Sequence, residues 1–411
     1  MGYEFDSGAQ SRLGGYFSAI GQVLNNKTRR ASFAVYATGL LGSAERKSAE
    51  PIAAISGADE ATCEPYHHRL LRFVRDSPWS DREVRLVAAR HAIEAMTQEE
   101  PIRTLIIDDT GFLKQGKHSV GVQRQYTGSA GKIANCQIGV SLSIATLTAH
   151  VPIDFELYLP ASWIDDEVRR TEAKIPSHMV FKTKEELALE MIERAVEAGV
   201  PGDIVLADSF YGRSKRFRER LRDLGFDYAL GVMPTQPLWR LDVRDRRNGE
   251  ASTARGIADQ LGQKAFRRFT WRAGTAPGAR GKLHSRFAFR RVKVANDDGS
   301  VPGTQEPVWL LMEWLEGEQR PTKFALTTLP RNMSKKRILR LFKERYRTEQ
   351  VYEEMKGELG LDHFEGRTFT GWHHHVSVAL CCYAFVISER MRRFPPSARR
   401  RGSACPVALA A

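Results

Sequence analysis

Residues 105–111 read Leu-Ile-Ile-Asp-Asp-Thr-Gly, a short apolar run that ends in two carboxylates and a turn. A second run of this kind, Ile-Val-Leu-Ala at 204–207, ends in Asp208. Each run predicts a buried strand. A carboxylate at the end of such a strand is expensive to desolvate, so it needs a strong partner. A backbone turn or an arginine is one option, since Asp commonly starts turns. A metal ion is the other.

The segments around these two strands set the expected fold. Three further apolar runs, separated by Gly-rich turns, predict antiparallel hairpins; they cover residues 119–126, 136–146 and 151–159. An amphipathic helix is expected at 182–198, a basic helix at 214–224 and a strand at 228–232. This order predicts an α/β protein with an RNase H-like mixed sheet and flanking helices. Such a sheet presents carboxylates from a first strand, a later strand and a C-terminal helix at one point.

The rest of the chain suggests five parts. Residues 1–100 carry apolar residues at helical spacing and predict a helical domain, for which DNA binding and ordinary helix packing are both open. Within it, Ser80 and Glu83 predict a capped helix start after a turn. The two helices across that turn fit a helix-turn-helix, or equally any packed helix pair. The remaining parts are the first part of the RNase H-like core, a β-rich insertion, the second part of that core and a basic flexible tail: residues 101–232, 233–325, 326–394 and 395–411.

A long helix expected over residues 334–359 carries a third acid, Glu349. Three residues with large, mainly apolar side chains precede it at spacings of four and three: Ile338, Phe342 and Tyr346. This spacing predicts that Glu349 lies on the inward face of the helix. Glu353 and Lys356 continue that face, with Arg345 beside it. Either the cations neutralise the glutamates in a structural network, or Glu349 completes a metal site while the cations face phosphates.

Three converging carboxylates suit Mg²⁺, which takes oxygen ligands and commonly uses few protein groups. Two such ions, about 3.5–4 Å apart, activate an attacking hydroxyl and stabilise the leaving oxygen in phosphoryl transfer. Mn²⁺ can substitute for Mg²⁺. The five cysteines show no Cys-x-x-Cys spacing, which argues against a zinc site and a disulfide framework. The run His373-His374-His375 resembles a metal site in composition, but adjacent side chains on a helix point different ways, so zinc binding by this run is not expected.

Charge points to a polyanionic partner. The 411 residues carry a formal net charge of +13, and Lys and Arg side chains neutralise phosphates. An apolar run of about 18 residues, as a membrane span requires, does not occur in the sequence. The start of the chain, with Glu4 and Asp6, lacks the apolar segment of a signal peptide. We therefore expect a cytoplasmic, nucleoid-associated protein.

At these residues the sequence resembles the DDE insertion-sequence transposases of bacteria, particularly a cut-and-paste group. The resemblance runs from about residue 39 to 385. Its blocks are residues 45–48, 77–81, 108–114, 121–126, 135–137, 207–212 and 345–367. Carried over by position, it implies that Asp108, Asp208 and Glu349 are the catalytic residues and hold the metal ions.

The resemblance also assigns neighbouring residues. The acid before Thr-Gly varies in the family, so Asp108 is favoured over its neighbour Asp109. Glu353 is the alternative to Glu349. Related transposases carry Tyr-x-x-Arg-x-x-x-Glu-x6-Lys, which Arg345, Glu349 and Lys356 fit, whereas Phe342 replaces the tyrosine. Arg345 and Lys356 are therefore expected to bind DNA.

The resemblance implies that the protein is a DNA transposase. It would bind the terminal inverted repeats of its element, act as a homodimer in the DNA complex, cleave the ends and join their 3′-hydroxyls to target DNA. Trp271 and Trp239 in the insertion are either core residues or, as in hairpin-forming relatives, stacking partners for a flipped base. Two alternatives are a non-catalytic DNA-binding protein derived from a transposase and an RNase H-like nuclease without strand transfer.

Overall fold

The computed structural model describes residues 5–56, 60–241, 249–272, 283–296, 300 and 306–395. The chain forms two compact units. Unit 1 consists of Met1–Arg103, Asp108–Pro201 and Arg347–Ala411, and unit 2 of Thr104–Ile107 and Gly202–Tyr346. Apart from Pro395, the tail expected at 395–411 lies outside the described residues. The other predicted domain boundaries lie where the sequence composition changes, whereas the two units are defined by contacts between residues. Those domain boundaries therefore remain predictions.

Helices make up the N-terminal part of unit 1, as predicted for residues 1–100. They are α1 (Ser7–Leu24), α2 (Lys27–Leu41), α3 (Ala49–Ser56), α4 (Glu60–Arg75) and α5 (Asp81–Thr97). Ser80 caps α5, because its side chain accepts a hydrogen bond from the Glu83 amide at 3.2 Å. The apolar face of α5 packs along α14 (Phe369–Arg393). Nearly the whole length of α14 is buried, so this helix forms the core of unit 1.

The strands of unit 1 form the predicted hairpins. They are the later part of β1 (Thr104–Leu113), β2 (Gln123–Thr127), β3 (Lys132–Ala145) and β4 (His150–Tyr158). β3 pairs antiparallel with both β2 and β4. The hairpin strands pack against α8 (Lys184–Glu197) and α14, and two short helices connect β4 to α8: α6 (Ala161–Ile164) and α7 (Glu167–Glu172). A Thr183–Glu186 capping box fixes the start of α8.

Unit 2 contains both parallel and antiparallel strands. The first residues of β1 pair in parallel with β5 (Ile204–Ala207), which pairs in parallel with β6 (Asp227–Val232). Antiparallel strands follow in the order β12, β11, β10, β7, β8, and β9 also pairs with β10. These strands are β7 (Pro237–Leu241), β8 (Gly249–Thr253), β9 (Arg267–Arg272), β10 (Leu283–Val294), β11 (Val308–Trp314) and β12 (Lys323–Thr327). The 12-stranded mixed sheet with flanking helices confirms the predicted fold class.

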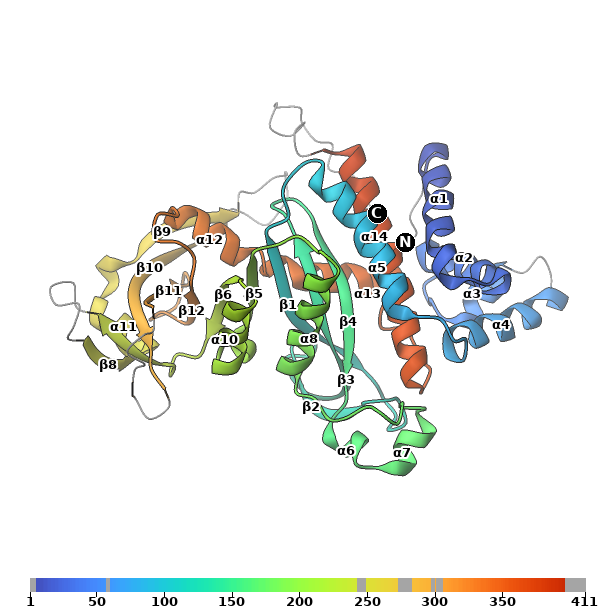
Figure 1. Cartoon of the computed structure of the whole chain (residues 1–411), viewed down its shortest axis with the longest axis horizontal. Helices are drawn as coiled ribbons and strands as arrows, with labels where there is room; N and C mark the ends of the chain where they lie inside the picture. The colour runs from blue at the N-terminus through green and yellow to red at the C-terminus, as the bar shows by residue number, and fades with distance from the viewer. Residues whose placement is uncertain are drawn as a thin grey trace. The chain divides into compact units, whose positions relative to one another are not determined.

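Short helices follow β5, β8 and β12 in unit 2 (Figure 1). They are α9 (Ser209–Gly212), α10 (Lys215–Asp223), α11 (Ala254–Leu261), the 3₁₀ turn η1 (Gln263–Ala265) and α12 (Lys335–Lys343). The β-rich insertion predicted from composition thus contains a helix, α11. None of the helices in the described ranges is long and apolar enough to cross a membrane.

The single helix expected over residues 334–359 is wrong. The chain forms α12 and then α13 (Tyr346–Leu359), with a turn at Glu344 and Arg345. The amide of Glu344 bonds back to Leu341 at a spacing of three residues, which tightens the last turn of α12 and ends it. The helical spacing of apolar residues in α12 therefore does not continue into α13. Glu349 is exposed, so its predicted position on an inward face is also wrong.

Candidate functional site

Asp108 and Asp109 are adjacent on β1 and have different surroundings within unit 1. Asp108 is buried, with a residual exposure of 9%, and its Oδ1 accepts a hydrogen bond from the Asp109 amide at 3.0 Å. Asp109 is half-buried, and its Oδ2 lies 2.8 Å from Nζ of Lys184 at the start of α8. Asp109 thus has a cationic partner on a neighbouring helix, as the non-catalytic interpretation of a strand-end carboxylate expects.

Asp208 immediately follows β5 in unit 2 and is the N-cap of α9. Its Oδ1 accepts hydrogen bonds from the amides of Phe210 at 2.9 Å and Tyr211 at 3.4 Å. Asp208 therefore forms the turn expected of such an aspartate with one oxygen, Oδ1, and these hydrogen bonds fix its side chain. Within the described residues Oδ2 has no hydrogen-bond partner and is available to a ligand.

Glu349 and Glu353 are both exposed on α13. Glu349 lies in the first turn, where the positive end of the helix dipole favours a carboxylate. The idea that Lys356 neutralises these glutamates is wrong for the described residues, since neither glutamate forms an ion pair with it. Arg345 is half-buried in the turn before α13.

Lys356 instead ties α13 to the end of β1. Its Nζ donates to Oγ1 of Thr110 at 2.9 Å, to the carbonyl of Gly111 at 2.7 Å and to Oγ of Ser129 at 3.2 Å. Burial lowers the pKa of Lys356, and the nearby Asp362 opposes that shift. This side chain has a structural role, and a phosphate contact by it remains a prediction.

The three candidate acids have side chains of the kind that a metal site requires. Carboxylate oxygens are the donors that Mg²⁺ prefers, so the chemistry of Asp108, Asp208 and Glu349 fits it. Among residues that the structure describes, however, no three acidic, His or Cys side chains lie close enough together to hold a metal ion. Asp108 and Glu349 belong to unit 1 and Asp208 belongs to unit 2.

The three consecutive histidines of α14 are buried structural residues. His373 Nε2 lies 3.3 Å from Glu156 Oε2, and the two ring nitrogens of His374 lie 2.8 and 3.0 Å from main-chain carbonyl oxygens. His375 contacts the Tyr36 hydroxyl at 2.9 Å and the Gly360 carbonyl at 3.0 Å. Burial lowers the pKa of His374 and of His375 to about 4.

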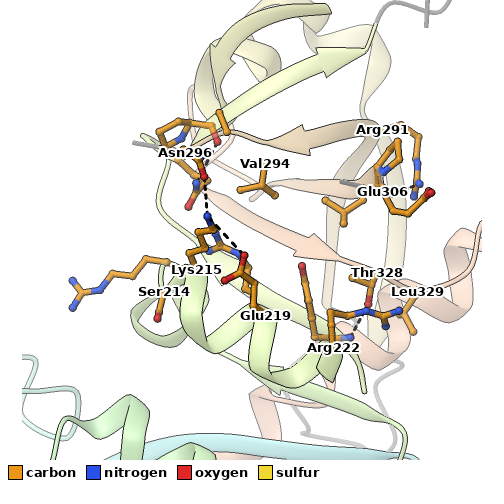
Figure 2. A pocket seen from close by; sticks show the side chains of 18 of the residues that line it. Ser214, Lys215, Glu219, Arg222, Arg291, Val294, Asn296, Glu306, Thr328 and Leu329 are labelled. Carbon is orange, nitrogen blue, oxygen red and sulfur yellow. Dashed lines mark hydrogen bonds and ion pairs between the residues drawn. The ribbon is translucent and has the colours of Figure 1, made fainter. Parts of the chain in front are cut away.

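A cavity of about 1400 Å³ lies in unit 2 beside α10 (Figure 2). Figure 2 shows Lys215 between Asn296 and Glu219, with Nζ distances of 3.1 and 3.8 Å to their side-chain oxygens. Arg222 lies at 2.6 Å from Asp227. Lys215 and Arg222 of this cavity are thus matched by polar or acidic groups of the protein itself.

The tryptophans singled out in the insertion are on strands. Trp239 lies on β7 and is half-buried. Trp271 lies on β9, but its side chain is outside the described residues, so base stacking by it remains a prediction.

Comparison with known proteins connects the first two acids to a family. A family model described as "DDE superfamily endonuclease" matches residues 20–278. Asp108 and Asp208 lie inside that range and Glu349 lies beyond it. A relative from Microchaete diplosiphon, "Probable transposase for insertion sequence element IS701", is 30% identical over 195 residues. That alignment covers 47% of this chain and 46% of the relative, so the chain spans about half of the relative's length.

Proposed function

Because the chain belongs to the DDE superfamily of endonucleases, and is therefore a nuclease, we propose that it is a DNA transposase. It binds the terminal inverted repeats of its element as a homodimer, cleaves the DNA, and joins the 3′-hydroxyl ends to target DNA. Asp108, Asp208 and Glu349 are the proposed catalytic residues and hold two Mg²⁺ ions. The transposase name of the Microchaete relative supports this activity.

The observation that carries the proposal is the parallel register of β1 and β5. Three consecutive pairs join the strands: Thr104 with Ile204, Leu105 with Val205, and Ile106 with Leu206. Asp108 and Asp208 each stand two residues beyond the last of these pairs. Parallel strands present equivalent ends at one edge of a sheet, which is where ligand sites of α/β proteins form.

The surroundings of the acids also favour this assignment. Lys184 already neutralises Asp109, which favours Asp108 as the ligand. The N-cap contact holds Asp208 by Oδ1 and leaves Oδ2 for a cation. Exposed Glu349 is accessible to a cation. When bound, Mg²⁺ supplies charge for the attacking and leaving oxygens of phosphoryl transfer.

The test replaces each acid by its amide and measures excision from a plasmid that carries the flanking element ends, with Mg²⁺ or Mn²⁺. Asp108→Asn, Asp208→Asn and Glu349→Gln should each lower cleavage by roughly a thousandfold, equivalent to about 4 kcal/mol of lost transition-state stabilisation. Asn is itself a good N-cap, so Asp208→Asn should fold normally. Binding of element ends should persist in all three variants.

Asp109→Asn and Glu353→Gln are the matched controls and should retain cleavage within about tenfold. If Glu349→Gln keeps cleavage and Glu353→Gln loses it, the third ligand is Glu353. Cleaved plasmid without joined products would favour the nuclease alternative. DNA binding without any cleavage by the unaltered protein would favour the non-catalytic alternative.

A further inference from the structure

A basic groove in unit 2 is lined by residues of η1, β9, β10 and the start of α12. We name it the β9–α12 groove; its cavity measures about 460 Å³. Six cationic side chains line it: Lys264, Arg267, Arg268, Arg290, Lys335 and Lys336. None of the described residues along it is acidic. The groove therefore concentrates positive charge that its own lining does not neutralise.

Neighbouring residues do little to balance that charge. In the described part of the chain, Arg268 is the one lining cation with a carboxylate in reach, Glu316 at 3.8 Å. Burial lowers the pKa of Arg290, and the positive charge of nearby Arg240 lowers it further. Arg240 therefore adds another positive charge close to the groove. The larger cavity of Figure 2 differs, because Lys215 and Arg222 there have acidic partners.

The start of α12 adds to the same field. Ser334 caps the helix, and its first turn contains Lys335 and Lys336 but no acidic residue. Helix stability favours the opposite arrangement, since the N-terminal end of the dipole is positive. An anion in the groove would therefore be stabilised by the side chains and by the helix end together.

The floor of the groove is aromatic but covered. Phe287 and Phe289 are only 4% and 6% exposed. Nζ of Lys335 lies 5.6 Å from the centre of the Phe289 ring, a cation–π contact that places the charge over the floor. Bases could not stack on these covered rings, whereas the exposed ammonium and guanidinium groups above them can reach phosphates.

We propose that the β9–α12 groove binds the phosphodiester backbone of double-stranded DNA without reading its sequence. Phosphate contacts position a protein on a duplex and carry no direct sequence information. The inference rests on the proposed function, which makes DNA the polyanion that the protein meets. It adds a DNA-binding surface to the residues proposed for catalysis.

The test neutralises three exposed lining cations that have no ion pair in the described residues, in the variant Lys264→Gln/Arg267→Gln/Lys336→Gln. The control, Arg320→Gln/Lys323→Gln/Arg393→Gln, removes the same charge at exposed positions outside both the groove and the helical domain of residues 1–100. Both are made in the Asp208→Asn background and measured by fluorescence anisotropy. The probe is a scrambled-sequence duplex of roughly 30 base pairs, about three helical turns.

The groove variant should bind at least about tenfold more weakly at 0.1 M salt. Its slope of log K against log salt should become shallower by up to about 2.7, or 0.9 per lost phosphate contact. The control should keep the parent slope. Equal losses in both variants would show a net-charge effect and overturn the inference, as would unchanged binding by the groove variant. Loss for one DNA sequence alone would contradict backbone binding.

Three further outcomes are distinguishable. If the parent protein binds no duplex, the proposed function itself fails. If poly-glutamate binds in the groove and duplex DNA does not, the partner is an acidic protein and the inference is wrong. If the groove variant melts below the control, single Lys264→Gln and Lys336→Gln variants replace it, each expected to change the slope by about 0.9.

Discussion

Arg85 is buried among carboxylates on α5 and β4 of unit 1, with 2% exposure of its side chain. Asp81 lies 2.7 Å from it and Asp154 3.0 Å. Burial alone would lower the pKa of Arg85, but these carboxylates outweigh it and raise the pKa above its usual value. Arg194 on α8 contacts Asp154 and Glu156 at 2.7 Å. These charges form one network that connects α5, β4 and α8.

Removing the central cation should destabilise the protein strongly. Arg85→Met leaves Asp154 and Glu156 short of a partner, and breaking a buried pair from one side costs about 3–5 kcal/mol. Arg82→Met is the matched control, since Arg82 also contacts Glu156, at 3.1 Å, but its side chain is 58% exposed. Its loss should lower the free energy of unfolding by no more than about 1 kcal/mol. Urea denaturation measures both, and equal losses would contradict the buried-network interpretation.

At the scale of elements, the histidines of α14 link stability to pH. His375 is buried with a pKa lowered to about 4 by desolvation. It is neutral in the folded protein and takes up a proton only after unfolding, where its pKa is about 6.5. Its contribution is therefore fully present above pH 6.5 and is lost as pH falls toward 4. Each such histidine lowers the free energy of unfolding by about 1.4 kcal/mol per pH unit in that window.

Substitution isolates this effect. His375→Gln keeps an amide donor for the Gly360 carbonyl and an acceptor for the Tyr36 hydroxyl, but it does not titrate. Its free energy of unfolding should fall less steeply between pH 6.5 and 5, where carboxylates contribute little. Denaturation curves at several pH values measure the slopes. Identical slopes for the variant and the parent protein would show that His375 does not titrate as proposed.

The elements also show where sequence reasoning succeeds and fails. β5 and the Ser80 cap were predictable, because a short apolar run and an N-cap residue are local signals. The break between α12 and α13 was not, since Glu344 and Arg345 are good helix formers and the turn depends on tertiary structure. The exposure of Glu349 followed from that break. Lys-Lys-Arg directly after the Ser334 cap was a visible signal of the basic groove that sequence analysis did not use.

At the scale of the whole molecule, contacts between residues far apart in the sequence explain the remaining differences between prediction and structure. The fold class followed from the order of apolar runs, but the pairing of Lys184 with Asp109 joins residues 75 positions apart. The contact of Lys356 with Thr110 spans 246 positions. Charge-pair partners this distant leave no periodic pattern in one sequence. Residue types therefore predicted the candidate acids, and the family resemblance favoured Asp108 over Asp109, whereas the ion pair between Asp109 and Lys184 could be found only in the structure.

The net charge of +13 gives a prediction for the molecule as a whole. If DNA is the partner, binding of an element-end duplex releases condensed counterions, and log K falls by about 0.9 per phosphate contact for each decade of salt. A protein making 6–10 such contacts loses about 10³–10⁵ in affinity between 50 and 200 mM salt. Asp108→Asn should keep the parent slope, because it removes a proposed metal ligand and not a phosphate contact. Anisotropy titrations over that salt range measure both slopes. A flat response would refute DNA as the partner, and a change confined to Asp108→Asn would show that Asp108 influences backbone binding rather than catalysis alone.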